Sequence, residues 1–309
     1  MQVHRDLSHL PAFRNAVITI GTFDGVHTGH RYILRQLQET AAAVNGETVI
    51  VTFDPHPREV LFPGDNKLRL LTTLPEKIQL LDKEGINHLV VVPFTKAFSE
   101  LSARAYLEDF LIARFKPHTI IIGYDHRFGH NREGGLELLE AEQQQYGFHL
   151  VEIPQQVVHN LSVSSTKIRE RLLEGNIALA DELLGYPYFL EGTVVHGDKM
   201  GRQLGYPTAN LQLADARKLI PSEGIYAVKA TLDNEPAIIK GVMSIGTRPT
   251  FNGTDLRLEV HLFDFNRDIY GAQLRVQFIG FIRHNRKFDN VEALIAQMDK
   301  DSAAAKKQL

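Results

Sequence analysis

Residues 16–30 read AVITIGTFDGVHTGH, and this stretch decides the fold of the first half of the chain. Its first five residues form an apolar run typical of a buried strand, and from His30 onward apolar residues keep the spacing of one helix face as far as Ala41. A glycine-rich turn between a strand and a helix brings backbone N–H groups and the positive end of the helix dipole together. The stretch therefore predicts a turn that binds an anion such as phosphate.

Strand-like and helix-like segments alternate on the C-terminal side of this turn. Strands are expected at residues 48–53, 88–92, 119–122 and 149–153. Helices are expected from Pro75, over 103–115 and over 136–146. This alternation predicts an α/β domain with a doubly wound parallel sheet, covered by helices on both faces. Ligands of such sheets bind beyond the carboxyl ends of the strands, which is where the glycine-rich turn is expected.

The pattern changes near residue 185. Two short helices are expected at 165–174 and 177–184. Strands punctuated by Gly, Asn and Pro then follow at 188–195, 224–232, 237–245, 256–263 and 273–282, and a final helix is expected at 291–305. Such strands are typical of an antiparallel sandwich or small barrel. We expect two domains, residues 1–185 and 186–309.

Composition excludes several classes of protein. Lys and Arg number 34 against 37 Asp and Glu, which gives a net charge of −3 over 309 residues and argues against a nucleic-acid partner. The absence of cysteine excludes disulfides, thiolate metal sites and cysteine nucleophiles. No signal-peptide core is present at the N-terminus, and no apolar run approaches the roughly 18 residues of a membrane span. We expect a cytoplasmic protein with small-molecule partners and no membrane contact, and its oligomeric state stays open.

The glycine-rich turn contains two histidines, His27 and His30. Gly21 and Gly25 allow close approach of the backbone, and Gly29 leaves room between the histidines. Because residues three apart at a helix start face the same direction, imidazolium or N–H donors can meet one phosphate as its charge develops. The chain has no GxxxxGK[ST] motif, which excludes a P-loop NTPase.

A second cluster of phosphate-binding groups is expected in VSSTKIRERL, residues 163–172. Ser164, Ser165 and Thr166 precede a helix that carries Lys167 and Arg169. The hydroxyl groups alone are typical N-caps. Hydroxyls, free N–H groups and two cations together also suit a phosphate, and the glycine-rich turn favours that interpretation.

The second half contains a glycine-rich segment, GTVVHGDKMGRQLGYPTANL, at residues 192–211. The glycines and cations of this segment suggest a loop that binds an anion; they are Gly197, Lys199, Gly201, Arg202 and Gly205. A turn with polar side chains is the simpler interpretation. Thr208 and Asn210 point the same way in an extended segment, and their oxygens suit Mg²⁺ bound to ATP phosphates.

Glu259 lies in RLEVHLFDF, residues 257–265. Leu258, Val260 and Leu262 share one face of the expected strand, so Glu259 and His261 share the other. A carboxylate in this position is usually exposed to solvent. The alternative is a general base, which must be held close to the hydroxyl that it deprotonates.

GTFDGVHTGH together with SSTKIRERL resembles the HxGH nucleotidyltransferase superfamily, and it is most similar to the N-terminal half of the bacterial bifunctional riboflavin kinase/FMN adenylyltransferases. The resemblance implies that ATP phosphates are held, during attack on the α-phosphate, by His27, His30, Ser165, Thr166 and Arg169. By the same resemblance, the wider ATP-binding set includes Gly21, Phe23, Asp24, Gly29, Asp125 and Ser164. VTFDPHPREV resembles the flavin-side loop of the family, with Asp54, Pro55, His56 and Pro57. The chain departs from the family pattern at His126, where phenylalanine is usual, and at Tyr186, where arginine is frequent.

The second half resembles the riboflavin kinase module of the same family. The similar blocks are residues 192–211, 221–228, 241–251 and 258–271, in the order that the family has. The resemblance implies a small antiparallel barrel with a C-terminal helix and an ATP loop containing Gly197, Lys199, Gly201 and Arg202. It further implies that Thr208 and Asn210 bind Mg–ATP and that Glu259 deprotonates the ribityl 5′-hydroxyl.

Together these features predict an enzyme that phosphorylates riboflavin to FMN and then adenylylates FMN to FAD, with ATP and Mg²⁺. Three alternatives stay open: another HxGH nucleotidyltransferase, a chain with one active module, and a flavin or nucleotide sensor without turnover. The PTAN and LEVHLFDF blocks argue against the first, because that chemistry does not need them. Candidate catalytic residues in both halves argue against the sensor.

Overall fold

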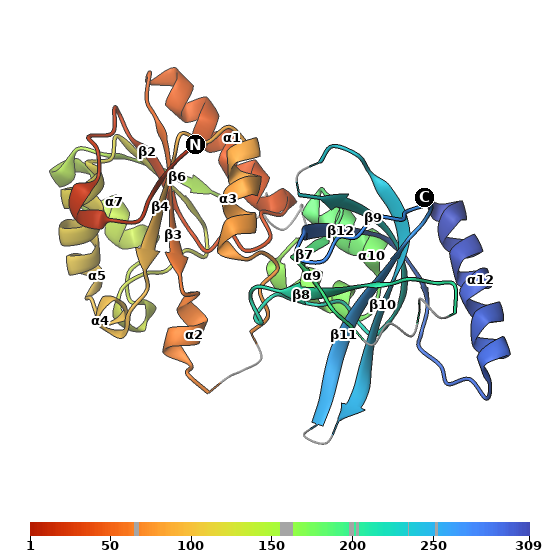
Figure 1. Ribbon diagram of the computed structural model, residues 1–309. Helices are drawn as coiled ribbons and strands as arrows, with labels where there is room; N and C mark the ends of the chain where they lie inside the picture. Colours follow the sequence, from red (N-terminus) through yellow and green to blue (C-terminus); the bar gives the residue numbers. More distant parts are fainter. Residues whose placement is uncertain (65–67, 155–162, 198–200, 202–203, 234, 251–252) are drawn as a thin grey trace. The chain divides into compact units, whose positions relative to one another are not determined.

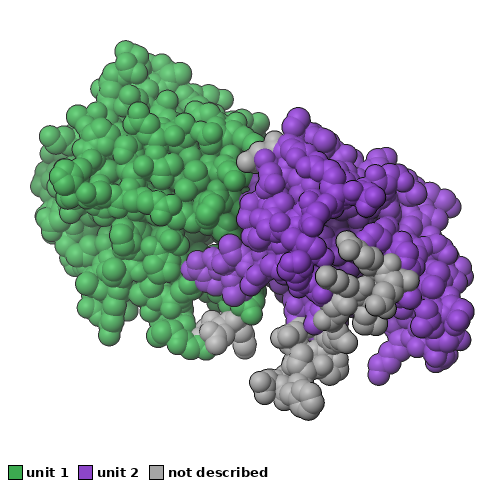
Figure 2. Space-filling model, viewed as in Figure 1, with its two compact units in different colours: residues 1–165 green, residues 166–309 purple. Residues whose placement is uncertain are grey.

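The computed structural model describes residues 1–64, 68–154, 163–197, 201, 204–233, 235–250 and 253–309. The chain forms two compact units, residues 1–165 and 166–309, coloured separately in Figure 2. The two units have different architectures, as the change of pattern in the sequence predicted.

The first unit contains a six-stranded parallel sheet in the order β1-β4-β3-β2-β5-β6 (Figure 1). Its strands are β1 (Gln2–His4), β2 (Val17–Ile20), β3 (Thr48–Asp54), β4 (His88–Pro93), β5 (Thr119–Gly123) and β6 (His149–Ile153). The expected parallel sheet is confirmed. The short edge strand β1 was not expected, because three residues give no usable periodicity.

Helices cover both faces of this sheet, with α1 and α3 on one side and α4, α5 and α7 on the other (Figure 1). The helices are α1 (Thr28–Ala43), α2 (Pro57–Leu61), α3 (Leu74–Lys83), α4 (Lys96–Ser99), α5 (Ala103–Ala105), α6 (Ala113–Phe115) and α7 (Leu136–Tyr146). The helix expected over 103–115 has a π-helical stretch, Tyr106–Ile112, between α5 and α6. Alternate strand residues such as Ile18 and Val51 pack against this stretch in one apolar core.

The second unit is a closed barrel of strands in the order β10-β11-β8-β7-β12-β9. The strands are β7 (Phe189–Val195), β8 (Ala209–Leu213), β9 (Gly224–Leu232), β10 (Ile239–Thr250), β11 (Gly253–Leu262) and β12 (Gln273–Arg283). The predicted antiparallel barrel is confirmed, and the C-terminal helix α12 (Val291–Gln308) packs on β9, β10 and β12. Strand β8 corresponds to the extended segment that carries Asn210.

Two helices precede the barrel, α9 (Ser165–Leu173) and α10 (Ile177–Leu184). They pack with the second unit: the backbone N–H of Ser222 donates to Leu172, and α10 contacts β12. The packing therefore divides the chain at 165/166. The boundary expected at 185/186 stays a prediction about where one function ends and the next begins.

None of the helices within the described ranges combines the length and the hydropathy needed to cross a membrane.

Asp181 on α10 gives the barrel unit a specific dependence on pH. Its carboxylate accepts the backbone N–H of Tyr188 at 2.7 Å, and burial raises its pKa to about 7. The unfolded chain ionises this group near pH 4, whereas the folded chain holds the proton until about pH 7. This carboxyl therefore lowers the free energy of unfolding as pH rises between those values.

We expect Asp181→Asn to keep the hydrogen bond to Tyr188 and to remove this pH dependence. The variant should gain about 2–4 °C in melting temperature at pH 8, and the gain should vanish near pH 4. Glu182→Gln, on the exposed side of the same helix, is the matched control. Equal shifts at both pH values would contradict the assignment.

Candidate functional site

Three of the predicted site segments lie at the carboxyl edge of the parallel sheet. Gly21 follows β2, Asp54 ends β3 and Asp125 follows β5. Strand β2 pairs in parallel with β3 on one side and with β5 on the other, so these strand ends are neighbours. The chain leaves β2 toward β3 and later returns to β5 on the opposite side, which makes this edge the topological switch point where such sheets bind ligands.

The turn after β2 is held in an uncommon backbone conformation. Phe23, Gly25 and Val26 have φ values of 48°, 86° and 38°, in the left-handed region that β-branched and bulky residues rarely adopt. The ring of Phe23 lies against Gly21, where a Cβ atom would come within 3.2 Å of it. A turn with two non-glycine residues in this region, Phe23 and Val26, is strained and needs an anchor to hold it.

That anchor is the buried carboxylate of Asp24. It accepts hydrogen bonds from the backbone N–H groups of Leu71 at 3.1 Å and Thr72 at 2.9 Å, and from the Thr72 hydroxyl at 3.3 Å. The backbone N–H of Gly25 donates to the same hydroxyl at 3.0 Å. The structure thus gives Asp24 a clear role in shaping the turn, and its predicted contact with ATP stays a prediction.

The two histidines meet at the start of α1. His27 caps this helix, and its Nδ1 accepts the backbone N–H of His30 at 3.3 Å. Their rings stack with 3.7 Å between centroids. Burial, His27 and the charge of Lys77 hold the pKa of His30 well below its usual value, so the ring is neutral at pH 7. The neutral donor is therefore favoured over the imidazolium.

The serine-rich segment packs against this turn within the first unit. The Ser165 hydroxyl donates to the backbone oxygen of Asp24 at 3.0 Å. A Cβ on Gly29 would come within 2.9 Å of Val163, so glycine permits this close approach. Three further predicted phosphate ligands lie close to Ser165 in the sequence: Ser164, Thr166 and Arg169. Thr166 and Arg169 lie on α9.

The predicted flavin-side loop follows β3. The Asp54–Pro55 peptide is cis, and His56 caps α2 by accepting the backbone N–H of Arg58 at 3.2 Å, with Pro57 as the first helical residue. Three aromatic rings lie beside the loop, with centroids 5.4–6.0 Å apart: Phe53, Phe94 and Phe98. Phe94 and Phe98 were not identified from the sequence. The three rings lie on or next to β3, β4 and α4, which are separate in the sequence and meet only in the folded chain.

The segment after β5 carries the first departure from the family pattern. Asp125 is exposed, and the backbone N–H of His126 donates to Gly123 at 3.0 Å in a tight turn. Burial lowers the pKa of His126 to about 4, so its ring is neutral near pH 7. The centroid of the His126 ring lies 5.9 Å from that of Phe128, so a neutral imidazole lies beside an aromatic ring. The second departure, Tyr186, lies 6.1 Å from the ring of Phe189 in the second unit.

Sequence reasoning missed Lys77, on helix α3. Its side chain is buried, its Nζ lies 3.4 Å from the hydroxyl of Thr52, and its charge acts on Asp24, Asp54 and His30. The signal was present in the sequence, because position 77 falls on the same helix face as the buried leucines three and four residues later.

The second site is a cavity of about 500 Å³ in the second unit, lined by strands of the barrel and by helix α12. Thr208, Asn210, Glu259 and His261 all line it. Strand β11 pairs with β8 so that Glu259 lies opposite Asn210. The leucines and valine that alternate with Glu259 are buried, so the predicted division of this strand into two faces is confirmed. His261 is held by a contact of 2.9 Å between its Nδ1 and the backbone oxygen of Pro207.

Two predicted glycines approach the polar side chains of this cavity closely. A Cβ on Gly197 would lie 2.1 Å from Asn210 Nδ2, and one on Gly201 would lie 3.3 Å from the Thr208 hydroxyl. The other members of the predicted ATP loop, Lys199 and Arg202, lie outside the described residues. The two described glycines therefore leave space that a larger residue would fill.

Helix α12 and the end of β12 form another wall of the cavity. Arg283 makes a two-pronged ion pair with the buried Asp301, at 2.8 and 2.7 Å, which fastens α12 to the barrel. Phe288, Leu294 and Met298 give this wall an apolar surface. Sequence reasoning missed these residues, since α12 has no motif and the ion pair joins distant elements.

The donor set around Asn210 suits a metal that arrives with a nucleotide. Within the described ranges, no group of three or more His, Cys, Asp and Glu side chains forms a metal cage. Thr208 and Asn210 supply neutral oxygen atoms beside the Glu259 carboxylate. Such hard oxygen donors fit Mg²⁺, which keeps phosphate and water ligands of its own.

An HxGH turn at the switch point of a parallel sheet, followed by a barrel unit whose cavity is lined by a carboxylate, a hydroxyl and an amide, is typical of a two-domain enzyme of nucleotide-dependent phosphate chemistry. The FAD synthetase family model matches residues 10–167, and the riboflavin kinase family model matches residues 184–309. The chain belongs to the family of bifunctional riboflavin kinase/FMN adenylyltransferases.

Individual relatives agree over nearly the full chain. A bifunctional riboflavin kinase/FMN adenylyltransferase from Listeria monocytogenes is 39% identical over 93% of this chain and 90% of its own length. One from Escherichia coli is 38% identical over 97% and 95%. A crystal structure from Streptococcus pneumoniae, named macrolide-efflux protein, is 30% identical, covers 99% of this chain and 98% of its own, and has a TM-score of 0.87.

We expect Asp24→Ala to destabilise the first unit. The change leaves two buried backbone N–H groups without their acceptor, so the free energy of unfolding should fall by about 2–4 kcal/mol. Urea unfolding measures this value, and the exposed Asp109→Ala is the control, with an expected change below about 0.5 kcal/mol. An equal effect of both substitutions would contradict the anchoring role.

Proposed function

We propose that this chain makes FAD from riboflavin in two ATP-dependent steps, one in each unit. The observation that supports this most is the separation of the two chemistries. His27, His30 and Ser165 gather at the sheet edge within the FAD synthetase match, and Asn210 and Glu259 meet in the barrel cavity within the riboflavin kinase match.

The proposed first step is phosphorylation of the riboflavin 5′-hydroxyl in the barrel. Glu259 accepts the hydroxyl proton, the hydroxyl oxygen attacks the γ-phosphorus of ATP, and ADP leaves. The apolar wall of Phe288, Leu294 and Met298 suits a flat ring, which would orient the ribityl chain toward the polar end of the cavity.

Mg²⁺ is the cation that we propose for this step. When bound with ATP, it neutralises charge on the phosphates, and Thr208 and Asn210 would hold it there. Gly197 leaves room for the Asn210 amide, because a Cβ at position 197 would lie 2.1 Å from its Nδ2.

The proposed second step is transfer of AMP from a second ATP to FMN. An oxygen of the FMN phosphate attacks the α-phosphorus, and pyrophosphate leaves. Because this phosphate is already an anion, the step needs no general base, and the unit contributes alignment and hydrogen-bond donors instead. His30, as a neutral ring, supplies one such donor.

Small molecules are the proposed partners of both units: riboflavin, FMN and ATP. Cells produce and consume ATP in the cytoplasm, and we place both reactions there.

Two substitutions separate the two activities. His30→Ala should lower FAD formation from FMN by roughly 10²–10³-fold, the effect of losing one preorganised donor, and should leave riboflavin phosphorylation intact. Glu259→Gln should lower phosphorylation by roughly 10²–10⁴-fold through loss of the base, and should leave FAD formation from added FMN intact. Separate chromatographic assays of FMN and FAD measure both.

Exposed residues of each unit supply the controls, His9→Ala and Glu223→Gln, which should change neither activity. Loss of both activities in either variant would contradict the assignment of one site to each step. FMN without FAD in the unaltered protein would support the one-module alternative and direct attention to His126.

A further inference from the structure

The ammonium group of Lys77 lies inside the first unit, next to residues of the proposed adenylyl-transfer site. The residue is 6% exposed, and its Nζ lies 3.4 Å from the Thr52 hydroxyl. A buried charge of this kind is costly unless other charges compensate for it. It needs an explanation that the steps described above do not give.

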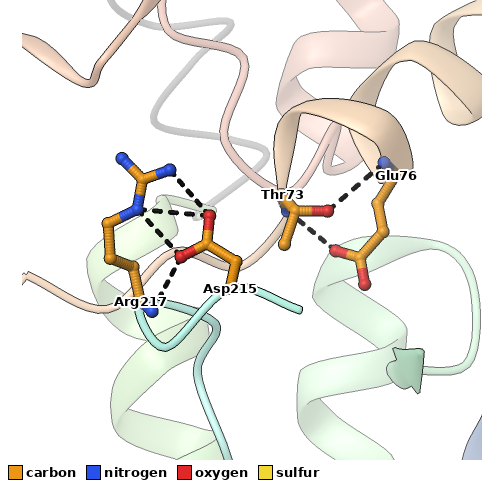
Figure 3. Close-up of polar contacts among 4 residues, drawn as sticks. All are labelled: Thr73, Glu76, Asp215 and Arg217. Carbon is orange, nitrogen blue, oxygen red and sulfur yellow. Dashed lines mark hydrogen bonds and ion pairs between the residues drawn. The ribbon is translucent and has the colours of Figure 1, made fainter. Parts of the chain in front are cut away.

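The backbone position of Lys77 is tied to the phosphate-binding turn. Thr73 and Glu76 form a capping box at the start of α3: the Thr73 N–H donates to Glu76 Oε2 at 2.8 Å, and the Glu76 N–H donates to the Thr73 hydroxyl at 3.4 Å (Figure 3). The two residues before this box donate their backbone N–H groups to Asp24. One short segment thus anchors the turn and carries the lysine.

The carboxylates that act on Lys77 belong to residues of the proposed adenylyl-transfer site. Burial lowers its pKa, while the carboxylates of Asp24 and Asp54 raise it. An ammonium has three donors; one reaches the Thr52 hydroxyl, which itself donates to the backbone oxygen of Thr22 in the turn at 3.2 Å. The negative charge of two carboxylates near the turn disfavours a bound phosphate, and a nearby ammonium group offsets that charge.

The charge of Lys77 also acts on His30. Burial is the main cause of the lowered pKa of that ring, followed by His27 and then by the charge of Lys77. Removal of the charge should therefore raise the pKa of His30, whereas a lysine that only filled space with its apolar stem would have no such effect.

We propose that Lys77 is a positioning residue of adenylyl transfer, whose buried ammonium group beside the phosphate-binding turn offsets the carboxylates of Asp24 and Asp54. This inference rests on the proposed FMN adenylyltransferase activity. It assigns a role to a residue that no motif of the sequence singled out.

The test uses the full chain with Lys77→Met, Lys77→Arg and the exposed Lys83→Met from the same helix as the matched control. For adenylyl transfer, kcat and KM are measured for FMN and for ATP. Lys77→Met should lower kcat/KM by about 10–100-fold. Lys77→Arg should recover most of the loss because it restores the charge, and Lys83→Met should match the unaltered protein. Riboflavin phosphorylation should be equal in all four.

A second readout is independent of turnover. Titration of the histidine ring signals by NMR in ¹⁵N-histidine-labelled protein should show a higher His30 midpoint in Lys77→Met and an unchanged one in Lys83→Met. If Lys77→Met does not fold, Lys77→Gln replaces it, because glutamine keeps a donor for Thr52.

The outcomes separate this inference from the function on which it rests. If the unaltered protein forms no FAD from FMN, the proposed function fails. If it forms FAD, and the neutral variant matches it in kcat/KM and in the His30 titration, only the role of Lys77 is overturned.

Discussion

The first site depends on the hydrogen bonds that Asp24 accepts from residues 71 and 72. A buried carboxylate that accepts two backbone N–H groups forms charge-assisted bonds, which are stronger than neutral ones. They hold a turn in which Phe23 and Val26 have left-handed backbone angles. The helix start, the stacked histidines and the contact to Ser165 all follow from the position of this turn.

The second site depends on strand register instead. Side chains on one strand alternate between the core and the cavity, so a shift of one residue would bury Glu259 and expose its apolar neighbours. The pairing of Glu259 with Asn210 fixes that register, and the Arg283–Asp301 ion pair fastens the helix that closes the cavity wall. One site is thus built from a loop and the other from a sheet.

Much of the fold and of both sites could be predicted from the sequence. Periodicity predicted the parallel sheet and a second unit of antiparallel strands, and the family resemblance implied that these strands form a barrel. The structure places His27 beside His30 and Asn210 opposite Glu259, and the roles of these residues stay predictions. The misses have a common cause. Helix spacing puts Lys77 on the buried face of α3. However, the neighbours of Lys77, Phe94 and Asp301 come from elements far away in the chain, and local patterns do not identify them. The lowered pKa of His30 could not be predicted either, because its main cause is burial in the folded chain.

The most direct test of the central claim follows phosphorus atoms from ATP into FAD. The unaltered protein is incubated with riboflavin and Mg²⁺, and with ATP labelled at the α- or the γ-phosphate in parallel reactions. Two successive transfers predict that γ-label appears first in FMN, and that FAD acquires one phosphorus from each position. Label from only one position in the flavin products would contradict a chain that catalyses both steps, and flavin without any label would contradict both.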